Sequence, residues 1–193
     1  MTGHAGFGSY DDAGMRIAVG LVNELAVDHV YGRPVGERDP RPGIARVLEI
    51  DPSMIVQLSA ADIPAFMVLA RQLHGVFRDL RDGDMDVAAA RVNDLLARHP
   101  AHPHLAKEDG RWRLHHHPAD APVVPMATAF CAEALARMIG AGEAGRLGTC
   151  RSDGCDRVFV DSSKNGSRRF CSTTCQNRVK AAAFRRRHAT GST

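Results

Sequence analysis

The chain of 193 residues carries a net charge of +3, and 44% of its residues are apolar. This composition can form one core and a small additional module, and it excludes a chain that is disordered throughout. The charge is uneven: residues 1–149 contain 15 Lys and Arg against 19 Asp and Glu, whereas residues 151–193 contain 10 against 3. A positive field concentrated near the C-terminus is suited to binding phosphate groups.

The sequence contains no run of 18 apolar residues, and its Gly-rich, polar start lacks the basic and apolar regions of a signal peptide. We therefore expect a cytoplasmic protein without a membrane-spanning helix. In such a reducing compartment, paired cysteines are more often metal ligands than disulfides.

Apolar residues at helical spacing predict a series of helices before residue 141. The expected helices span residues 14–31, 44–50, 59–81, 85–98 and 125–140. Ser59 and Asp62 are spaced as a capping box at the start of the third helix. The Asp109-Gly110 pair predicts the turn of a β-hairpin over residues 104–117. The expected loops are 32–43 and 118–125, and the Gly-rich residues 140–148 are expected to form a flexible joint.

Four cysteines follow that joint in two close pairs. They are Cys150, Cys155, Cys171 and Cys175. Two close pairs separated by a loop are typical of a structural site for one zinc ion, while a redox pair or disulfides are the alternative. Because four thiolates leave no open position on zinc, we expect no metal catalysis. The fifth cysteine, Cys131, stands in an apolar run and is expected to be buried.

Local patterns between and after the cysteines predict a small module. Residues 158–160 are expected as a strand and 161–166 as a turn, and Ser172 or Thr173 can cap a helix that runs to about His188. The arrangement resembles a treble-clef finger. We therefore predict a mostly α-helical domain with one β-hairpin over residues 1–140, followed by a treble-clef-like zinc finger over residues 146–188.

Basic residues surround and follow the second cysteine pair. The candidate nucleic-acid contacts are Arg168, Arg169, Asn177, Arg178, Lys180, Arg185, Arg186 and Arg187. The arginines and the lysine can contact phosphates, and Asn177 can contact base edges. The alternatives are a solvated tail for the three consecutive arginines and a hydrogen bond from Asn177 to the backbone of the finger.

Histidines gather around the expected hairpin. They are His102, His104, His115, His116 and His117. A second metal or haem site is one interpretation, and ordinary surface histidines are the other.

The C-terminal segment resembles the CGNR zinc finger family. The resemblance rests on Cys-x4-Cys, on Phe159-x-Asp161-x-Ser163, on Arg168-Arg169-Phe170-Cys171-Ser172 and on Cys175-x-Asn177-Arg178-x-Lys180. Gln176 stands where the family name has Gly, which departs from the motif without touching the four ligands.

The preceding part is similar to the helical ABATE domain that accompanies this finger in bacterial proteins. The matching pieces are Leu21-Val22-Asn23, Leu25-Ala26-Val27-Asp28, Val92-Asn93-x-x-Leu96 and Asp109-Gly110-x-Trp112. The resemblance implies a stress-induced transcription regulator of bacteria.

The sequence contains no G-x-S-x-G, no P-loop and no H-E-x-x-H motif, so we expect no catalytic activity. The alternative is an enzyme with a structural finger, in which carboxylates such as Asp28 meet others in a cleft. Our first hypothesis is a cytoplasmic transcription regulator that binds DNA through the finger, while its helical domain senses a small-molecule signal or forms a homodimer. The second is a zinc-stabilised adaptor that binds RNA or protein without recognising a DNA sequence.

Overall fold

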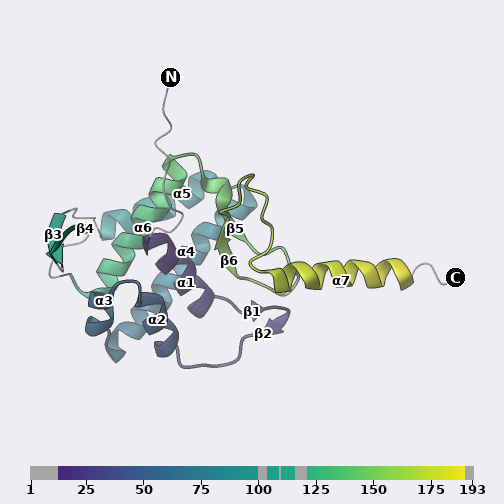
Figure 1. The fold of residues 1–193 in the computed structure, drawn as a ribbon, viewed down its shortest axis with the longest axis horizontal. Coiled ribbons are helices and arrows are strands. Elements are labelled where there is room, and N and C mark those ends of the chain that lie inside the picture. Colours follow the sequence, from purple (N-terminus) through teal and green to yellow (C-terminus); the bar gives the residue numbers. More distant parts are fainter. Residues whose placement is uncertain (1–12, 100–103, 109, 116–120, 190–193) are drawn as a thin grey trace, which may run out of the picture.

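The computed structural model describes residues 13–99, 104–108, 110–115 and 121–189, which form helices joined by short antiparallel hairpins (Figure 1). The helices are α1 (Ala13–Leu25), α2 (Arg41–Leu48), α3 (Pro52–Gln57), α4 (Ile63–Asp82), α5 (Met85–Arg98), α6 (Val123–Gly140) and α7 (Thr173–Ala189), with 3-10 turns η1 (Ala60–Asp62) and η2 (Ala144–Arg146). The strands are β1 (His29–Val30), β2 (Arg33–Pro34), β3 (His104–Glu108), β4 (Arg111–His115), β5 (Leu147–Thr149) and β6 (Val158–Val160). The expected fold class, mostly helical with a small cysteine module, is confirmed.

The core lies where α1, α4, α5 and α6 pack together. Ile17, Leu21 and Val22 recur on one face of α1 and are buried, as the apolar spacing of the sequence predicts. Helices α1 and α6 approach closely at Gly14, where a Cβ atom would lie 2.3 Å from the carbonyl oxygen of Phe130. Any larger residue there would push the two helices apart.

Helix α6 has a composition and length with which a helix can cross a membrane, alone among the helices of the described residues. Half of it is buried inside the protein, including Cys131, which is fully buried as predicted. Burial raises the pKa of the Cys131 thiol far above its usual value. The apolar composition of α6 is therefore explained by the position of this helix in the protein core.

Helix boundaries follow local signals. The N–H and hydroxyl of Ser59 donate to the Asp62 carboxylate at 2.9 and 2.6 Å, at the expected start of the third helix. Helix α4 ends at Gly83, whose φ of +89° allows Asp84 to donate its N–H to the carbonyl of Asp79.

Helix α1 is shorter than expected, because the chain turns back after Leu25 to form the β1–β2 hairpin. Tyr31 and Gly32 at its tip have φ values of 55° and 83°. Positive φ at both central residues is the signature of a type I′ turn. Residues 33 and 34, expected in a loop, thus form the second strand of this hairpin.

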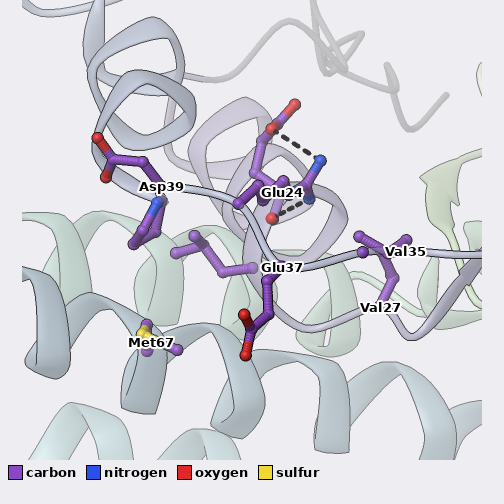
Figure 2. A pocket seen from close by; sticks show the side chains of 10 residues that line it. Glu24, Val27, Val35, Glu37, Asp39 and Met67 are labelled. Atoms are coloured by element: carbon purple, nitrogen blue, oxygen red, sulfur yellow. Dashed lines mark hydrogen bonds and ion pairs between the residues drawn. The ribbon is translucent and has the colours of Figure 1, made fainter.

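An open cleft of about 690 Å³ lies beside this hairpin (Figure 2). It is lined by Glu24 and Leu25 of α1, by Val27, by residues 35–40 after β2, and by Met67 of α4. Glu24 closes one side, since its carboxylate pairs with Arg38 at 3.8 Å and with Arg46 at 3.3 Å. Carboxylates and apolar side chains share the lining.

Candidate metal centre and nucleic-acid interface

The four paired cysteines converge on one point. Their sulfur atoms all lie within 4.8 Å of one another. The Cys171 Sγ lies 3.8 Å from the Cys155 Sγ and 3.7 Å from the Cys175 Sγ. Four sulfurs placed about 2.3 Å from a tetrahedral zinc ion stand about 3.8 Å apart, whereas a disulfide brings two sulfurs to about 2.05 Å. The spacing of the sulfurs therefore fits one structural zinc ion.

The β5–β6 hairpin positions the first pair of cysteines. Cys150 directly follows β5, and its N–H donates to the carbonyl of Arg157 at 2.8 Å, which extends the ladder beyond the strands. Cys155 follows Gly154, whose φ of +65° turns the chain between the two cysteines. Strand β6 was expected, but β5 begins within residues 140–148, where we expected a flexible joint.

The second pair lies at the start of α7. Ser172 caps this helix, because its hydroxyl accepts the N–H of Cys175 at 3.3 Å. The predicted capping residue is thus confirmed. Cys175 lies in the first turn of the helix, where the helix dipole favours a thiolate, but burial and hydrogen bonds with Cys155 and Cys150 raise the pKa of its thiol.

The sulfur atoms share negative charge unequally. The pKa of Cys150 is lowered to about 5, because the Cys171 thiol and the backbone N–H groups of Cys171 and Ser152 donate to its sulfur. The pKa of Cys171 is raised by its donation to Cys150, by burial and by the neighbouring negative charges. Four thiolates at this spacing therefore require a cation, and zinc supplies one.

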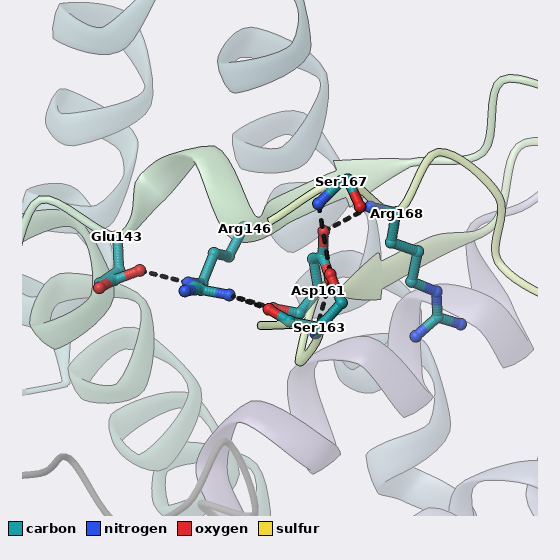
Figure 3. A network of polar contacts seen from close by, with 6 residues as sticks. All are labelled: Glu143, Arg146, Asp161, Ser163, Ser167 and Arg168. Carbon is teal, nitrogen blue, oxygen red and sulfur yellow. Dashed lines mark hydrogen bonds and ion pairs between the residues drawn. The ribbon is translucent and has the colours of Figure 1, made fainter. Parts of the chain in front are cut away.

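A network of polar groups holds the loop between the cysteine pairs (Figure 3). The Asp161 carboxylate is buried and accepts the N–H groups of Ser163 at 2.8 Å and Arg168 at 2.6 Å. Arg146 donates to the carbonyls of Asp161 and Ser163 at 3.1 and 2.8 Å, and it pairs with Glu143. The loop is thereby fixed to η2, which precedes β5.

Arg168, a candidate phosphate contact, is hydrogen-bonded within the finger. Its guanidinium donates to the carbonyls of Phe170 at 2.9 Å, Val160 at 3.3 Å and Cys171. It also lies over the ring of Phe159, 4.7 Å from the centroid. These contacts hold the backbone that carries Cys171.

Arg178 is likewise occupied inside the finger. Its guanidinium donates to the Ser152 hydroxyl at 3.0 Å and to the Asp153 carbonyl at 3.3 Å, which ties α7 to the turn between the first two cysteines. The tip of the β1–β2 hairpin covers this guanidinium. A Cβ atom on Gly32 would lie 1.9 Å from it.

The remaining candidate contacts lie on the surface of the finger and along α7. They are Arg169, Asn177, Lys180, Arg185, Arg186 and Arg187, all exposed. The side chain of Asn177 makes no hydrogen bond to any other residue that the structure describes. The alternative in which Asn177 ties down the backbone of the finger therefore finds no support in this arrangement.

The sequence analysis missed the residues that dock the finger on the helical part. Asn23 of α1 both donates to and accepts from the backbone of Val158, at 3.0 and 2.9 Å. The β1–β2 hairpin adds bonds from Asp156 N–H to the His29 carbonyl at 2.9 Å and from Gly32 N–H to the Gly154 carbonyl at 2.7 Å. No local pattern indicates such pairs, because more than 120 residues separate their members.

The expected β3–β4 hairpin is present, with His104 and His115 opposite one another in its register. The side chains of both residues, and all of His102, His116 and His117, lie outside the part of the chain that the structure describes. The second metal or haem site stays a sequence-based alternative.

Two family models match the chain. Residues 146–188 match the CGNR zinc finger, and residues 35–142 match ABATE, described as "Putative stress-induced transcription regulator". The curated proteins include no significant match. The second model covers more than half of the chain, and both matches agree with the resemblance seen in the sequence. The chain therefore belongs to the ABATE family of transcription regulators and carries a CGNR zinc finger after that domain.

Proposed function

We propose that this protein is a cytoplasmic bacterial transcription regulator that binds DNA through its zinc finger and α7. The observation that carries the proposal is the charge and position of α7. This helix contains five basic and no acidic side chains, and it extends away from the body of the protein (Figure 1). A helix of this charge that extends from the body of the protein can approach the phosphates of a DNA duplex.

The predicted contacts then divide into two groups. Lys180, Arg185, Arg186, Arg187 and Arg169 are exposed and would pair with phosphates, while Asn177 would contact a base edge. Arg168 and Arg178 are held by groups of the finger itself, so we assign them to positioning rather than to DNA contact.

The helical domain would receive a signal or form a homodimer. The cleft beside residues 35–40 can accommodate a small molecule, and its wall continues into the β1–β2 hairpin. That hairpin is hydrogen-bonded to the finger through Gly32 and His29. A ligand in the cleft could therefore alter how the finger is held.

A salt titration of DNA binding tests the proposal. The zinc-loaded protein is titrated against a duplex selected from a random pool and against its scrambled version. Neutralising Arg185, Arg186 and Arg187 together should weaken binding to both duplexes and flatten the salt dependence by roughly 0.9 for each phosphate that is no longer neutralised. Asn177→Ala should reduce the difference between the duplexes and leave the salt dependence unchanged.

Two results would contradict DNA recognition. Absence of duplex binding at low salt would exclude it, and equal affinity for every duplex or a preference for structured RNA would favour the adaptor hypothesis.

A further inference from the structure

The outer side of α7 carries an aromatic residue that the proposed phosphate contacts do not explain. Phe184 is 56% exposed. Its ring lies 4.1 Å from that of His188, a residue of the same helix. A phenylalanine exposed to this extent on a polar helix leaves apolar surface in water that a partner could cover.

Helical periodicity places Phe184 on the side of α7 that faces away from the zinc site. Cys175 is buried against the other three cysteines and fixes the inner side of the helix. Asn177, Lys180, Phe184 and Arg187 recur at intervals of three or four residues on the opposite side. A partner that contacts Asn177 and lies along this side of α7 would therefore also contact Phe184.

The charge of α7 selects the kind of partner that can cover Phe184. The helix has basic residues at 178, 180 and 185–187 and no acidic residue. A second copy of α7 would bring like charges together, which disfavours pairing of two such helices. An anionic partner is required, and the major groove of DNA is wide enough to admit an α-helix.

The major groove offers one apolar group, the 5-methyl of thymine. We propose that Phe184 contacts a thymine methyl group and so contributes to the choice of DNA site, an inference that rests on the proposed DNA binding. Seven residues separate Asn177 from Phe184, which is about 10 Å along the helix. The thymine should therefore lie about three base pairs from the base that Asn177 contacts.

Replacing thymine by deoxyuridine removes only the methyl group and provides the test. Full-length, zinc-loaded protein is titrated against the selected duplex and against duplexes with deoxyuridine at each thymine in turn. At one or two positions the replacement should weaken binding about fourfold, the equivalent of one buried methyl group. Phe184→Ala should bind the thymine and deoxyuridine duplexes equally with an unchanged salt dependence, and Phe184→Leu should keep part of the difference.

Val87→Ala is the matched control, since Val87 is 48% exposed on α5, and it should keep the full response to the methyl group. If the wild type binds the selected site specifically and its affinity is unchanged by deoxyuridine at every position, the role of Phe184 is overturned and DNA recognition is left intact. A uniform decrease in the affinity of Phe184→Ala for all duplexes would also overturn it. Absence of duplex binding by the wild type would instead refute the proposed function.

Discussion

At the scale of single residues, neighbouring arginines of the finger have different surroundings. Both side chains are exposed, but Arg168 donates to three backbone carbonyls, whereas the Arg169 side chain makes no hydrogen bond to another residue that the structure describes. The sequence Arg168-Arg169 gives no indication of this division, because both side chains have the same chemistry. The spacing of the cysteines, by contrast, predicted correctly that their four sulfur atoms meet at one point, because local geometry brings together four residues within a 26-residue segment.

Arg168→Ala should weaken zinc binding and lower the stability of the finger by about 1 kcal/mol, because three carbonyls lose their donor. Arg169→Ala is the matched control and should leave both quantities unchanged while weakening DNA binding. Competition with a chromogenic zinc chelator and thermal unfolding measure the two effects. Equal zinc affinity in both variants would show that Arg168 does not support the site.

Asp161 should make the stability of the finger depend on pH. Burial alone would raise the pKa of its carboxyl, but hydrogen bonds from Ser163 and Arg168 outweigh burial and lower it. A lowered folded-state pKa means that this stabilisation is present above the unfolded pKa of about 3.9 and is lost as the pH falls through the folded value.

Asp161→Asn removes that charge and should cost roughly 1–3 kcal/mol at pH 7. The difference from the wild type in urea unfolding should shrink below about pH 4. A difference that stays constant down to about pH 2 would contradict this assignment.

At the scale of elements, long periodic segments were predictable and short ones were not. Helices α4, α5 and α6 follow the expected ranges within a few residues, since their apolar spacing extends over several turns. Helix α3 lies between the helices expected over residues 44–50 and 59–81 and was not expected; it begins at Pro52, because proline is well suited to the first position of a helix. Strand β5 was missed because Gly148 suggested flexibility, whereas it makes room for the Phe159 ring.

The β1–β2 hairpin should be sensitive to a single methyl group. Gly32→Ala introduces a side chain at a φ of +83° and places it against the Arg178 guanidinium. We expect a destabilisation of about 1–2 kcal/mol from the backbone conformation alone. Gly36→Ala, in open space, is the control and should have little effect. Thermal unfolding compares them, and a Gly32→Ala protein as stable as the control would refute the contact.

At the scale of the whole molecule, the finger contributes to the main core. Leu147 and Val158 are buried in the same cluster as α1 and α4 side chains, and Asn23 bonds the backbone of Val158. The division into residues 1–140 and 146–188 stays a prediction. These contacts make us expect that the helical part alone folds with reduced stability.

Removing zinc should therefore affect α1 as well as the finger. Chelation should increase amide hydrogen exchange strongly in the finger and measurably around Asn23. The reason is that the β5–β6 hairpin, to which Asn23 is bonded, is no longer held by the metal site. Asn23→Ala should reproduce the second effect with zinc bound and cost about 1–3 kcal/mol. Asn93→Ala, an exposed residue of α5, is the control. If the rate of hydrogen exchange in α1 is the same before and after chelation, the helical part and the finger are energetically independent.

Helix α7 is held by the rest of the finger only near its N-terminal end, so a small rotation there moves its C-terminal end by a larger distance. The helix is fixed at Cys175 and by the Arg178 bonds, and about 21 Å of it extends beyond Cys175. A tilt of about 10° at that pivot would displace its far end by roughly 3.6 Å, close to the spacing of one base pair. If the finger binds DNA as proposed, a small adjustment among the four sulfur atoms that tilts α7 by this angle would shift the far end of the helix by about one base pair along the duplex.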